Sequence, residues 1–517
     1  MRFGIASIFS FRPHVEHLAY LAAVLEGGGH EIHGFTCDAA LSHCYSRDLR
    51  GRARVTHCAG CVIGGIRSFT VPRLWSVNRR LRSSLDERRL ARLTVSSIAT
   101  RYRTESGADL EIPDLRAAQQ QLYGPMEVIY GNAKRWIGER KLDAVLLFNG
   151  RMDLTAALAA ACEDCRIPYV SVERSWFGHG LLLNPDQNCL GLREIKRMSL
   201  EFRDAPLLAD QARYAGRIAA DRFRQRNTLE WRLYNMNSES GAWPGPAGST
   251  RVAILPSSKN EVEGHPDYQS HWSDHTEPME LLLRKLHLDP TWCVLRCHPN
   301  WSERVGLNTG WRSERLYSEW GRKLGMTVIP SSERVNTYAL IEQADLVVVN
   351  ASSTGVEAGL RGKPVVGIGH APYEDAGFSV HIQDDPDWGL LDELKRHDPE
   401  RSIRRTLRYL YTYGRRFTQF EDYVRAHTTL RYEYLRGADP SRLVRMCENR
   451  RLEPDDPASG TDDESETSIV QLVRRGDWDT LGKWERPRIQ ARTLQVRRRF
   501  GLRWVDGVRS ILPRGDL

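Results

Sequence analysis

The clearest chemical signal in the sequence lies between residues 344 and 369. An apolar run predicts a buried strand that ends at Asn350, and a helix is predicted from about residue 356. Small hydroxyl and glycine residues fill the turn between them: Ser352, Ser353, Thr354 and Gly355. Hydroxyls and backbone N–H groups at the start of a helix attract anions, and Glu357 in the first turn could accept hydrogen bonds from ribose hydroxyls. The same residues could instead serve only as a helix cap.

A second candidate group stands at the end of the strand predicted over residues 293–299. His298 follows the strand directly, and Pro299 prevents the strand from continuing. A histidine there could donate to a phosphate or protonate it as it leaves, although a lone histidine at a strand end is more often structural. Arg296 and Lys363 add positive charge that could stabilise a departing nucleotide.

Polar residues also follow the strands predicted near the N-terminus. These strands span residues 2–8, 143–150 and 167–173, and helices are predicted over residues 14–27 and 153–165. In open parallel sheets, ligands bind beyond the carboxyl ends of the strands. The polar residues at or near these ends are Arg12, His14, Asn149, Arg151, Glu173 and Arg174. We therefore expect a second binding edge in this part of the chain.

Four cysteines cluster early in the chain: Cys37, Cys44, Cys58 and Cys61. Two residues separate the last pair, which is a common spacing in zinc sites, and four thiolates complete a tetrahedral site. A structural zinc is therefore one hypothesis, with His43 and His57 as alternative ligands. The irregular spacing between the two pairs leaves buried free thiols, or another cofactor, as the other hypothesis.

Predicted strands and helices alternate along the chain and position these residues. This alternation indicates an α/β protein with two Rossmann-like, doubly wound domains. A length of 517 residues suits two such domains and a tail. We expect an N-terminal domain over residues 1–240 and, after a linker rich in glycine and proline, a C-terminal domain over residues 251–440. The acidic run over residues 453–468 is predicted to be a disordered linker, and residues 469–517 to form a basic tail of helical or disordered character.

The formal net charge of +8 favours anionic partners such as nucleotides, acidic glycans or a membrane face, although an arginine-rich proteome would explain it equally. No nucleic-acid-binding motif accompanies it, so no nucleic-acid partner is expected. The basic tail, interleaved with apolar residues, could lie on an anionic membrane or pack as an ordinary helix. No apolar run reaches about 18 residues and no signal peptide is evident, so we expect a cytoplasmic protein, with peripheral contact at the inner membrane face as an option.

Several segments, taken in order, resemble one known family. ILPSSKNEVEG, LRCHPN, NASSTGVEAGLRGKPVVGIG and PYEDAGF are similar to segments of the capsule polysaccharide biosynthesis family of bacterial glycosyltransferases, which includes the Kdo transferases. The N-terminal segments FTCDAALSHC, HCAGC, LLFNGR and VSVERSW resemble a subgroup found in polysaccharide gene clusters. The resemblance covers most of residues 1–440 and not the tail. It implies the GT-B architecture, in which two Rossmann-like domains face a cleft.

The resemblance implies a glycosyltransferase that moves a sugar from a nucleotide-activated donor to a surface polysaccharide or a lipid-linked glycan. His298 with Pro299 and the hydroxyl cluster would bind the nucleotide phosphates, and Glu357 would hold the ribose. No metal would be required for catalysis, and the His-Pro and Ser motifs together favour a CMP-activated sugar. The alternatives are a nucleotide-sugar epimerase or hydrolase of similar fold, and a non-catalytic component of capsule export or glycan binding.

The acceptor of GT-B enzymes usually meets the N-terminal domain, so the polar strand ends there form the predicted acceptor side. Glu173 is the preferred general base or nucleophile because it ends a buried strand. A structural ion pair between Glu173 and Arg151 is an equally good interpretation, and Asp38 is a second, weaker candidate. His298 and Glu173 are thus the two predicted catalytic residues.

Overall fold

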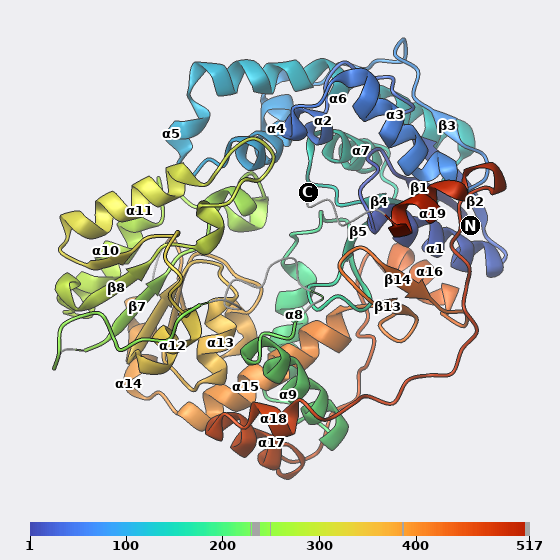
Figure 1. Ribbon diagram of the computed structural model, residues 1–517. Helices are drawn as coiled ribbons and strands as arrows, with labels where there is room; N and C mark the ends of the chain where they lie inside the picture. The colour runs from blue at the N-terminus through green and yellow to red at the C-terminus, as the bar shows by residue number, and fades with distance from the viewer. Residues whose placement is uncertain (228, 230–237, 249, 385–386, 512–517) are drawn as a thin grey trace.

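The computed structural model describes residues 1–227, 229, 238–248, 250–384 and 387–511. Two α/β halves, each built on a sheet that has six strands within these residues, make up the body of the molecule (Figure 1). The predicted fold class, two Rossmann-like domains, is confirmed by this architecture. Among the described helices, none is long and apolar enough to cross a membrane.

The sheet of the first half has the strand order β3-β2-β1-β4-β5-β6. Its strands are parallel except β6, which pairs antiparallel with β5. They are β1 (Arg2–Ala6), β2 (Glu31–Thr36), β3 (Trp75–Ser76), β4 (Ala144–Phe148), β5 (Tyr169–Arg174) and β6 (Leu181–Pro185). All five residues of β4 are buried, as expected for an uninterrupted apolar strand in the middle of a covered sheet.

The helices of the first half begin with α1 (His14–Gly27), whose bounds are those predicted from the sequence. The other helices of this half are α2 (Tyr45–Arg50), α3 (Arg54–Gly64), α4 (Glu87–Tyr102), α5 (Gly107–Leu110), α6 (Pro113–Arg140) and α7 (Asp153–Asp164). Helices α4 and α6 pack on α7 and close one face of the sheet, while α5 reaches across to the second half (Figure 1).

The sheet of the second half has the strand order β12-β11-β10-β7-β8-β9, and all its strands are parallel. They are β7 (Val252–Leu255), β8 (Cys293–Arg296), β9 (Thr327–Ile329), β10 (Leu346–Val349), β11 (Val365–Ile368) and β12 (Val380–Ile382). The helices between them are α10 (Thr276–Lys285), α11 (Trp311–Lys323), α12 (Thr337–Gln343) and α13 (Thr354–Leu360), and the short α14 (Asp392–Lys395) follows β12.

Each sheet reverses its strand order at one place. In the first sheet β1 lies between β2 and β4, and in the second sheet β7 lies between β8 and β10. At such a switch point the connections leave in opposite directions, so a crevice opens beyond the carboxyl ends of the two strands. The residues that follow β1, β4, β7 and β10 are therefore the ones that the fold offers to ligands.

The chain crosses to the second half after β6, before the boundary predicted at residue 240, and returns to the first half before residue 440. Helices α8 (Arg193–Phe202) and α9 (Ala209–Phe223) pack against α15 (Pro399–Tyr411) on the second half. The hairpin of β13 (Val424–Ala426) and β14 (Tyr432–Tyr434), followed by α16 (Pro440–Asn449), returns to α1 on the first half. Tyr20 of α1 stacks on Tyr434 and donates to the carbonyl of Leu435 at 3.1 Å. Neither half is thus a single stretch of sequence.

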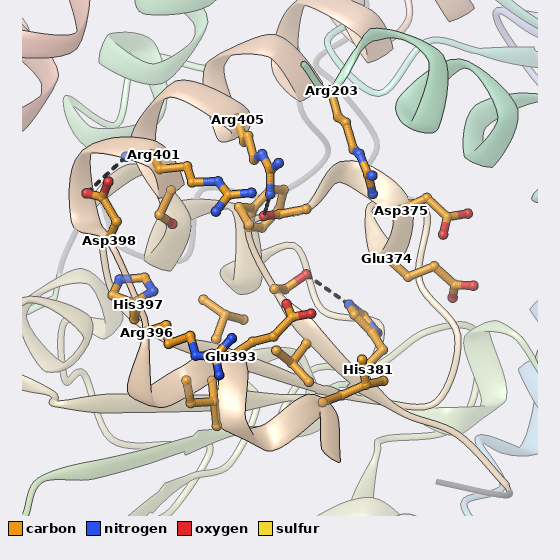
Figure 2. A pocket seen from close by; sticks show the side chains of 18 of the residues that line it. Arg203, Glu374, Asp375, His381, Glu393, Arg396, His397, Asp398, Arg401 and Arg405 are labelled. Carbon is orange, nitrogen blue, oxygen red and sulfur yellow. Dashed lines mark hydrogen bonds between the residues drawn. The ribbon is translucent and has the colours of Figure 1, made fainter. Parts of the chain in front are cut away.

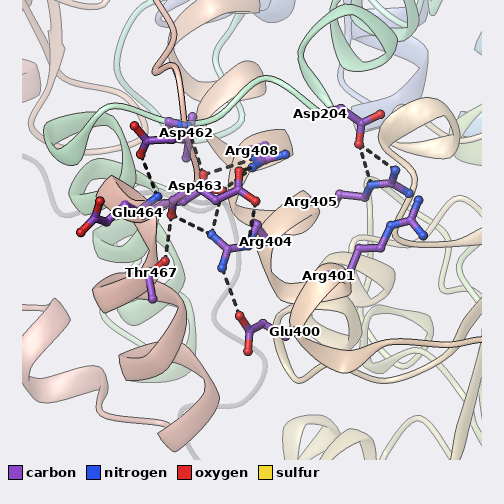
Figure 3. Close-up of polar contacts among 12 residues, drawn as sticks. Asp204, Glu400, Arg401, Arg404, Arg405, Arg408, Asp462, Asp463, Glu464 and Thr467 are labelled. Atoms are coloured by element: carbon purple, nitrogen blue, oxygen red, sulfur yellow. Dashed lines mark hydrogen bonds and ion pairs between the residues drawn. The ribbon is translucent and has the colours of Figure 1, made fainter.

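The acidic segment over residues 453–468 is not the solvated linker that its composition predicts. Arginines of α15 bind it: Arg408 donates to Asp463 at 2.6 Å, and Arg404 donates to the backbone carbonyl of the same residue (Figure 3). Glu466, in α17 (Glu464–Arg475), is fully buried and accepts from Arg404 at 3.0 Å. Guanidinium groups supplied by a distant helix therefore neutralise the charge that would otherwise keep this segment in water.

The predicted basic tail also packs against the body of the protein. Helices α17 and α18 (Trp478–Leu481) lie on α9, and the chain then runs upward along the hairpin to α19 (Trp504–Ile511) beside the first half (Figure 1). Arg498 is fully buried there and donates to the carbonyl of Ile63 at 2.6 Å. Residues 512–517 of the predicted tail lie outside the described residues.

Candidate functional site

One buried asparagine ties together the two strands at the switch point of the second sheet. Asn350 follows β10; its side-chain carbonyl accepts from the backbone N–H of Ser257, after β7, and its amide donates to the carbonyl of the same residue. The amide also lies 2.9 Å from Nδ1 of His275 and 3.3 Å from the hydroxyl of Tyr317. Side-chain hydrogen bonds of Asn350 thus fix the residues that follow β7 and β10, beyond which the strand order predicts a crevice.

A cavity of about 510 Å³ opens at this switch point, between α4 and α5 of the first half and the carboxyl edge of the second sheet. Its walls include Ala351 after β10 and Gly369 after β11. Its lining carries cationic, imidazole, aromatic and two carboxylate side chains: Arg92, Lys259, His265, His271, His275, His370, Tyr268, Trp272, Glu263 and Asp384. Cationic, imidazole and aromatic groups around one crevice suit a phosphorylated, ring-containing ligand.

Two His-Pro pairs near this edge have the same geometry. His265 and His298 each precede a 3₁₀ turn, and the Nδ1 of each accepts a backbone N–H two residues later, at 3.0 and 3.2 Å. Because Nδ1 is the acceptor, the proton of each neutral ring lies on Nε2. Burial lowers the pKa of both histidines to about 4. A neutral ring at pH 7 can donate a hydrogen bond from Nε2, and the low pKa disfavours the acid role considered for His298, which stays a prediction.

The position of His298 agrees with the strand-end prediction. It follows β8, the strand next to β7, and so lies at the same carboxyl edge as the residues after β10. Pro299 begins the 3₁₀ turn that His298 caps. His298 is not among the residues that line the cavity, whereas His265 and His275 are.

The hydroxyl cluster at the start of α13 is mostly engaged with itself. The hydroxyls of Ser352 and Thr354 lie 2.7 Å apart, and the Ser352 hydroxyl also accepts from the backbone N–H of Thr354 at 3.3 Å. Tyr373 donates to the Ser352 carbonyl at 2.7 Å, and a Cβ on Gly355 would lie 2.6 Å from the same tyrosine hydroxyl. Ser353, the N-cap residue, makes no side-chain cap bond. The Ser352 hydroxyl thus accepts from the first backbone N–H of α13, and phosphate binding by the cluster stays a prediction. The close approach of Tyr373 requires a glycine at position 355.

Three residues predicted to bind the donor have other roles. The guanidinium of Arg296 is buried and donates to the carbonyls of Cys297, Pro330 and Glu333, so it closes a loop instead of facing a ligand. Lys363 precedes β11 and interacts with Glu342 and Asp345, at the amino edge of the sheet. It is therefore at the opposite end of the strands from the cavity.

Glu357 is the third residue with a different role. It is buried, and Nε of Arg222 in α9 donates to its Oε1 at 2.8 Å. Arg222 lies 135 residues earlier in the chain, so no sequence pattern indicates the pair. The ion pair links α9 to α13. Because the Glu357 carboxylate is buried and paired with Arg222, it does not face the cavity and is not placed to bind a ribose in the way that the resemblance implies.

A second group of polar side chains lies at the switch point of the first sheet. Oε1 of Glu173, at the end of β5, is 3.1 Å from Nδ1 of His14, at the start of α1. Oε2 accepts from the amide of Asn149 at 3.0 Å, and the backbone N–H of Arg174 donates to Oε1 at 3.0 Å. Asn149 holds a left-handed φ of 63°, which aims its side chain at the carboxylate. Burial lowers the pKa of His14, which packs against the ring of Phe148.

The remaining predicted acceptor-side residues connect this group to its surroundings. Arg151 donates to the hydroxyl of Thr100 and, across the interface, to the carbonyl of Asn260 at 3.0 Å. The partner of Glu173 is therefore His14 and not Arg151. Arg174 donates to the carbonyl of Leu229, and Arg12 pairs with Glu16.

The two polar edges are joined by the loop after β6. Asn149 lies 3.0 Å from the sulfur of Cys189, and the amide of Gln187 donates to Asp267 at 3.1 Å. Asp267 belongs to the turn that carries His265 into the cavity. The acceptor-side group and the donor-side cavity are thus neighbours across the boundary between the halves.

The four early cysteines do converge. Cys37, Cys44, Cys58 and Cys61 line one pocket of about 30 Å³, together with His57 and Asp38. Within the described residues, however, no three His, Cys, Asp or Glu side chains are arranged to hold a metal ion. Burial raises the pKa of Cys37 to about 11 and also raises that of Cys61, which favours neutral thiols. The side-chain geometry therefore does not fit a tetrahedral zinc site, and structural zinc stays an untested prediction.

A larger pocket, of about 690 Å³, lies beside the edge strand β12. Arg203, Arg401 and Arg405 line one side, and Glu393 and Arg396 lie opposite (Figure 2). Its walls carry both signs of charge, as do those of the switch-point cavity, and neither pocket includes a site residue predicted from the sequence. The two differ in position, because the cavity lies beyond the carboxyl ends of β7 and β10, whereas this pocket lies beside the edge strand. We take the smaller cavity at the switch point as the candidate site.

The fold and the site together define a two-domain protein of GT-B architecture with a polar cavity between its halves. Residues 258–412, which carry most of that cavity, match the family described as capsule polysaccharide biosynthesis protein. The family resemblance that the motifs indicated is thereby confirmed for this segment. No curated protein matches the chain significantly.

The solved structures to which the chain is similar show low identity and low TM-scores. The KpsC β-Kdo 2,4 transferase of Thermosulfurimonas dismutans is 17% identical, with 64% of this chain and 87% of that chain covered and a TM-score of 0.32. The β-Kdo 2,7 transferase KpsC of the same organism is 15% identical, with 67% and 89% covered and a TM-score of 0.34. A UDP-GlcNAc 2-epimerase of Neisseria meningitidis is 11% identical, with 80% and 96% covered and a TM-score of 0.28.

Sequence reasoning missed four side chains of the cavity: Lys259, His265, His275 and His370. His265 had a detectable signal, because it repeats the His-Pro pair of residues 298 and 299. The other three lie in loops or at a helix start without a local pattern, and only the strand order brings them to the same edge.

Proposed function

We propose that the protein transfers a sugar from a nucleotide-activated donor to a glycan acceptor in capsule polysaccharide synthesis. The observation that carries the proposal is the placement of two chemically different polar edges side by side. One is the imidazole-lined cavity at the β7–β10 switch point, and the other is the His14–Glu173 pair at the β1–β4 switch point. The family match over residues 258–412 supports a role in capsule synthesis.

The donor nucleotide would occupy the cavity. Imidazole Nε2–H groups of His265 and His275 would donate to its phosphate, since Nδ1 of each ring accepts from, or faces, an amide N–H of the protein. His370 also lines the cavity, and its hydrogen bond with Glu374 raises its pKa, which favours the protonated ring. These groups would stabilise the negative charge that develops on the phosphate oxygen as the sugar leaves. A CMP-activated sugar is the favoured donor.

The acceptor hydroxyl would meet His14. The lowered pKa keeps this imidazole neutral near pH 7, so it can take the hydroxyl proton while the oxygen attacks the anomeric carbon. The bond from that carbon to the phosphate oxygen breaks with its electron pair, and the nucleotide leaves. Glu173, 3.1 Å from Nδ1, would stabilise the imidazolium that forms.

Glu173 is better suited to positioning than to nucleophilic attack. Its two oxygens interact with His14, the Asn149 amide and the Arg174 backbone N–H. A carboxylate whose lone pairs are engaged in this way is a poor nucleophile, so the base role moves from Glu173 to His14. A single displacement, without a glycosyl-enzyme intermediate, follows.

The experiment combines a binding screen with product analysis on the full-length protein. Thermal shifts with CMP, UDP, GDP and dTDP identify the nucleotide, since saturation at 100 times Kd adds about 2.7 kcal/mol. The matching nucleotide-sugar is then incubated with and without capsule oligosaccharide. Sugar incorporation that depends on the acceptor supports the proposal. Conversion of the donor alone to an epimer, or glycan binding without turnover, would overturn it.

A further inference from the structure

The C-terminal segment is a strap that ends beside the acceptor-side residues. Arg436 donates its backbone N–H to the carbonyl of Arg492 at 2.8 Å, and Leu494 donates to the carbonyl of Tyr434 at 2.7 Å. Farther along, the backbone N–H of Arg499 donates to the carbonyl of Ser68 at 2.7 Å. The strap thus leaves the second half, follows the β13–β14 hairpin and reaches the first half, where α19 lies (Figure 1).

The end of the strap exposes apolar side chains at helical spacing. Phe500 is 85% exposed, Trp504 62% and Val508 47%, whereas Val505, on the other side of α19, is 7% exposed. Trp504 and Val508 are four residues apart in α19 and so share one face, and Phe500 lies in the 3₁₀ turn that leads into this helix. We call Phe500, Trp504 and Val508 the apolar stripe. Large exposed aromatics that line up in this way indicate a contact surface.

The charge around the apolar stripe is cationic. From residue 486 to residue 508 the sequence contains seven arginines and a single acidic residue, Asp506. Arg497 and Arg503 are exposed next to the stripe, and the guanidinium of Arg503 lies 5.4 Å from the Phe500 ring. Asp506 is neutralised by Arg498 at 2.8 Å. The surface therefore presents aromatic and apolar groups within a positive field.

The apolar stripe is close to the acceptor-side group. A carboxylate oxygen of Asp506 is 4.0 Å from the guanidinium of Arg12, and Arg12 is two residues before His14. The helix that carries Trp504 and Val508 thus contacts one of the acceptor-side residues.

We infer that the apolar stripe and its arginines dock the protein on an anionic lipid bilayer. Trp and Phe partition into the headgroup region of a bilayer, and arginines beside them bind anionic headgroups, so the two signals reinforce each other. A protein partner would instead favour an apolar centre with few charges. Docking on a bilayer does not require enzymatic activity. Only its biological purpose, the approach of a lipid-linked acceptor, rests on the proposed function.

The test is co-sedimentation of the full-length protein with two kinds of vesicle. One kind contains phosphatidylcholine alone, and the other contains in addition about 40% phosphatidylglycerol, an anionic lipid. The wild-type protein should bind the anionic vesicles and not the neutral ones. The double variant F500S/W504S should bind at least about tenfold less tightly, because it removes the buried apolar contribution. Its Tm should not change, since both side chains are exposed.

The matched control is Trp311→Ser, which removes a 47% exposed tryptophan at the start of α11 on the other half. This variant should bind anionic vesicles like the wild type. Failure of the wild type to bind, or equal binding by the double variant, would overturn the inference. So would a dimer in vesicle-free solution that the double variant abolishes, because the stripe would then face a second copy. Transfer to a soluble acceptor, measured separately, reports on the proposed function alone.

Discussion

Nδ1 of His14 lies 3.1 Å from Oε1 of Glu173, although the two residues are 159 positions apart in the chain. His14 begins α1 after the first strand, and Glu173 lies at the end of β5, so the pair straddles β4 at the edge of the sheet. Asn149, which follows β4, donates to the other carboxylate oxygen. The start of α1 and the ends of β4 and β5 thus bring three polar side chains together at one edge of the sheet.

Replacing His14 with alanine should abolish acceptor-dependent transfer while donor binding is kept. The variant removes the proposed base, which contributes about 10² to 10⁴ in rate, and it leaves the cavity of the second half intact. The measurements are transfer kinetics and a nucleotide thermal shift. Glu173→Gln should retain part of the activity, since it positions the imidazole; complete loss in Glu173→Gln with normal rates in His14→Ala would reverse the two roles.

The pH dependence of transfer should report the state of His14. Burial lowers its pKa from the usual 6.5, so kcat/KM should stay level below pH 6.5 and fall only when the imidazole takes up a proton. Glu173 opposes that shift, so Glu173→Gln should move the acidic limb to still lower pH. Profiles of kcat/KM between pH 5 and about 8 test this in the window around the histidine pKa. An acidic limb that moves to higher pH in the variant would contradict the assignment.

The buried histidines should also make stability decline in acid. His14, His275 and His298 each have a folded-state pKa below the usual 6.5. The unfolded chain then binds more protons than the folded chain below that pH, so the free energy of unfolding falls as pH falls. Denaturant unfolding at pH 7 and about pH 5 should show the decrease. Burial raises the pKa of Glu105 to about 8 and that of Asp153 to about 7, which acts in the opposite direction, so the histidine contribution is measured by comparison with a His298→Gln variant. An equal pH dependence of stability in the wild type and this variant would contradict the shift of His298.

The Arg222–Glu357 pair should act in stability and not in donor binding. Both side chains are at least about nine-tenths buried, and loss of one partner leaves a buried charge, so Glu357→Gln should cost about 3–5 kcal/mol of unfolding free energy. Glu342→Gln, which breaks the neighbouring and more exposed pair with Arg361, is the control and should cost less than about 1 kcal/mol. A stable Glu357→Gln protein with weakened nucleotide binding would restore the ribose role.

The donor side is tested by comparing a residue at the carboxyl edge with one at the amino edge. His265→Ala, which removes one of the proposed phosphate donors of the cavity, should lower transfer by about 10² to 10³, the usual loss for one donor to a developing negative charge. Lys363→Ala should leave transfer unchanged, because Lys363 lies at the amino edge near Glu342 and Asp345. Similar losses in both variants would mean that the nucleotide does not bind where the strand order places it.

The sequence by itself determined which residues stand at strand ends. Apolar runs and glycine stops are local patterns, and they place His14 at the start of α1, Asn350 after β10 and His298 after β8. Because the sheets are parallel, such strand-end residues share one edge, so the sequence also indicated two binding edges and a pair of Rossmann-like domains.

Only the tertiary structure decided which of these side chains meet a ligand and which meet each other. Arg222 donates to Glu357, 135 residues further along the chain, and Arg404 of α15 donates to the buried Glu466. Carboxylates that the sequence offers as candidate binding groups are therefore neutralised in the fold. The reason is physical: a buried charge requires a partner, and the partner is chosen by packing between elements far apart in the chain. For the same reason, Glu173 pairs with His14 and not with Arg151, which instead donates to the carbonyl of Asn260 in the other half.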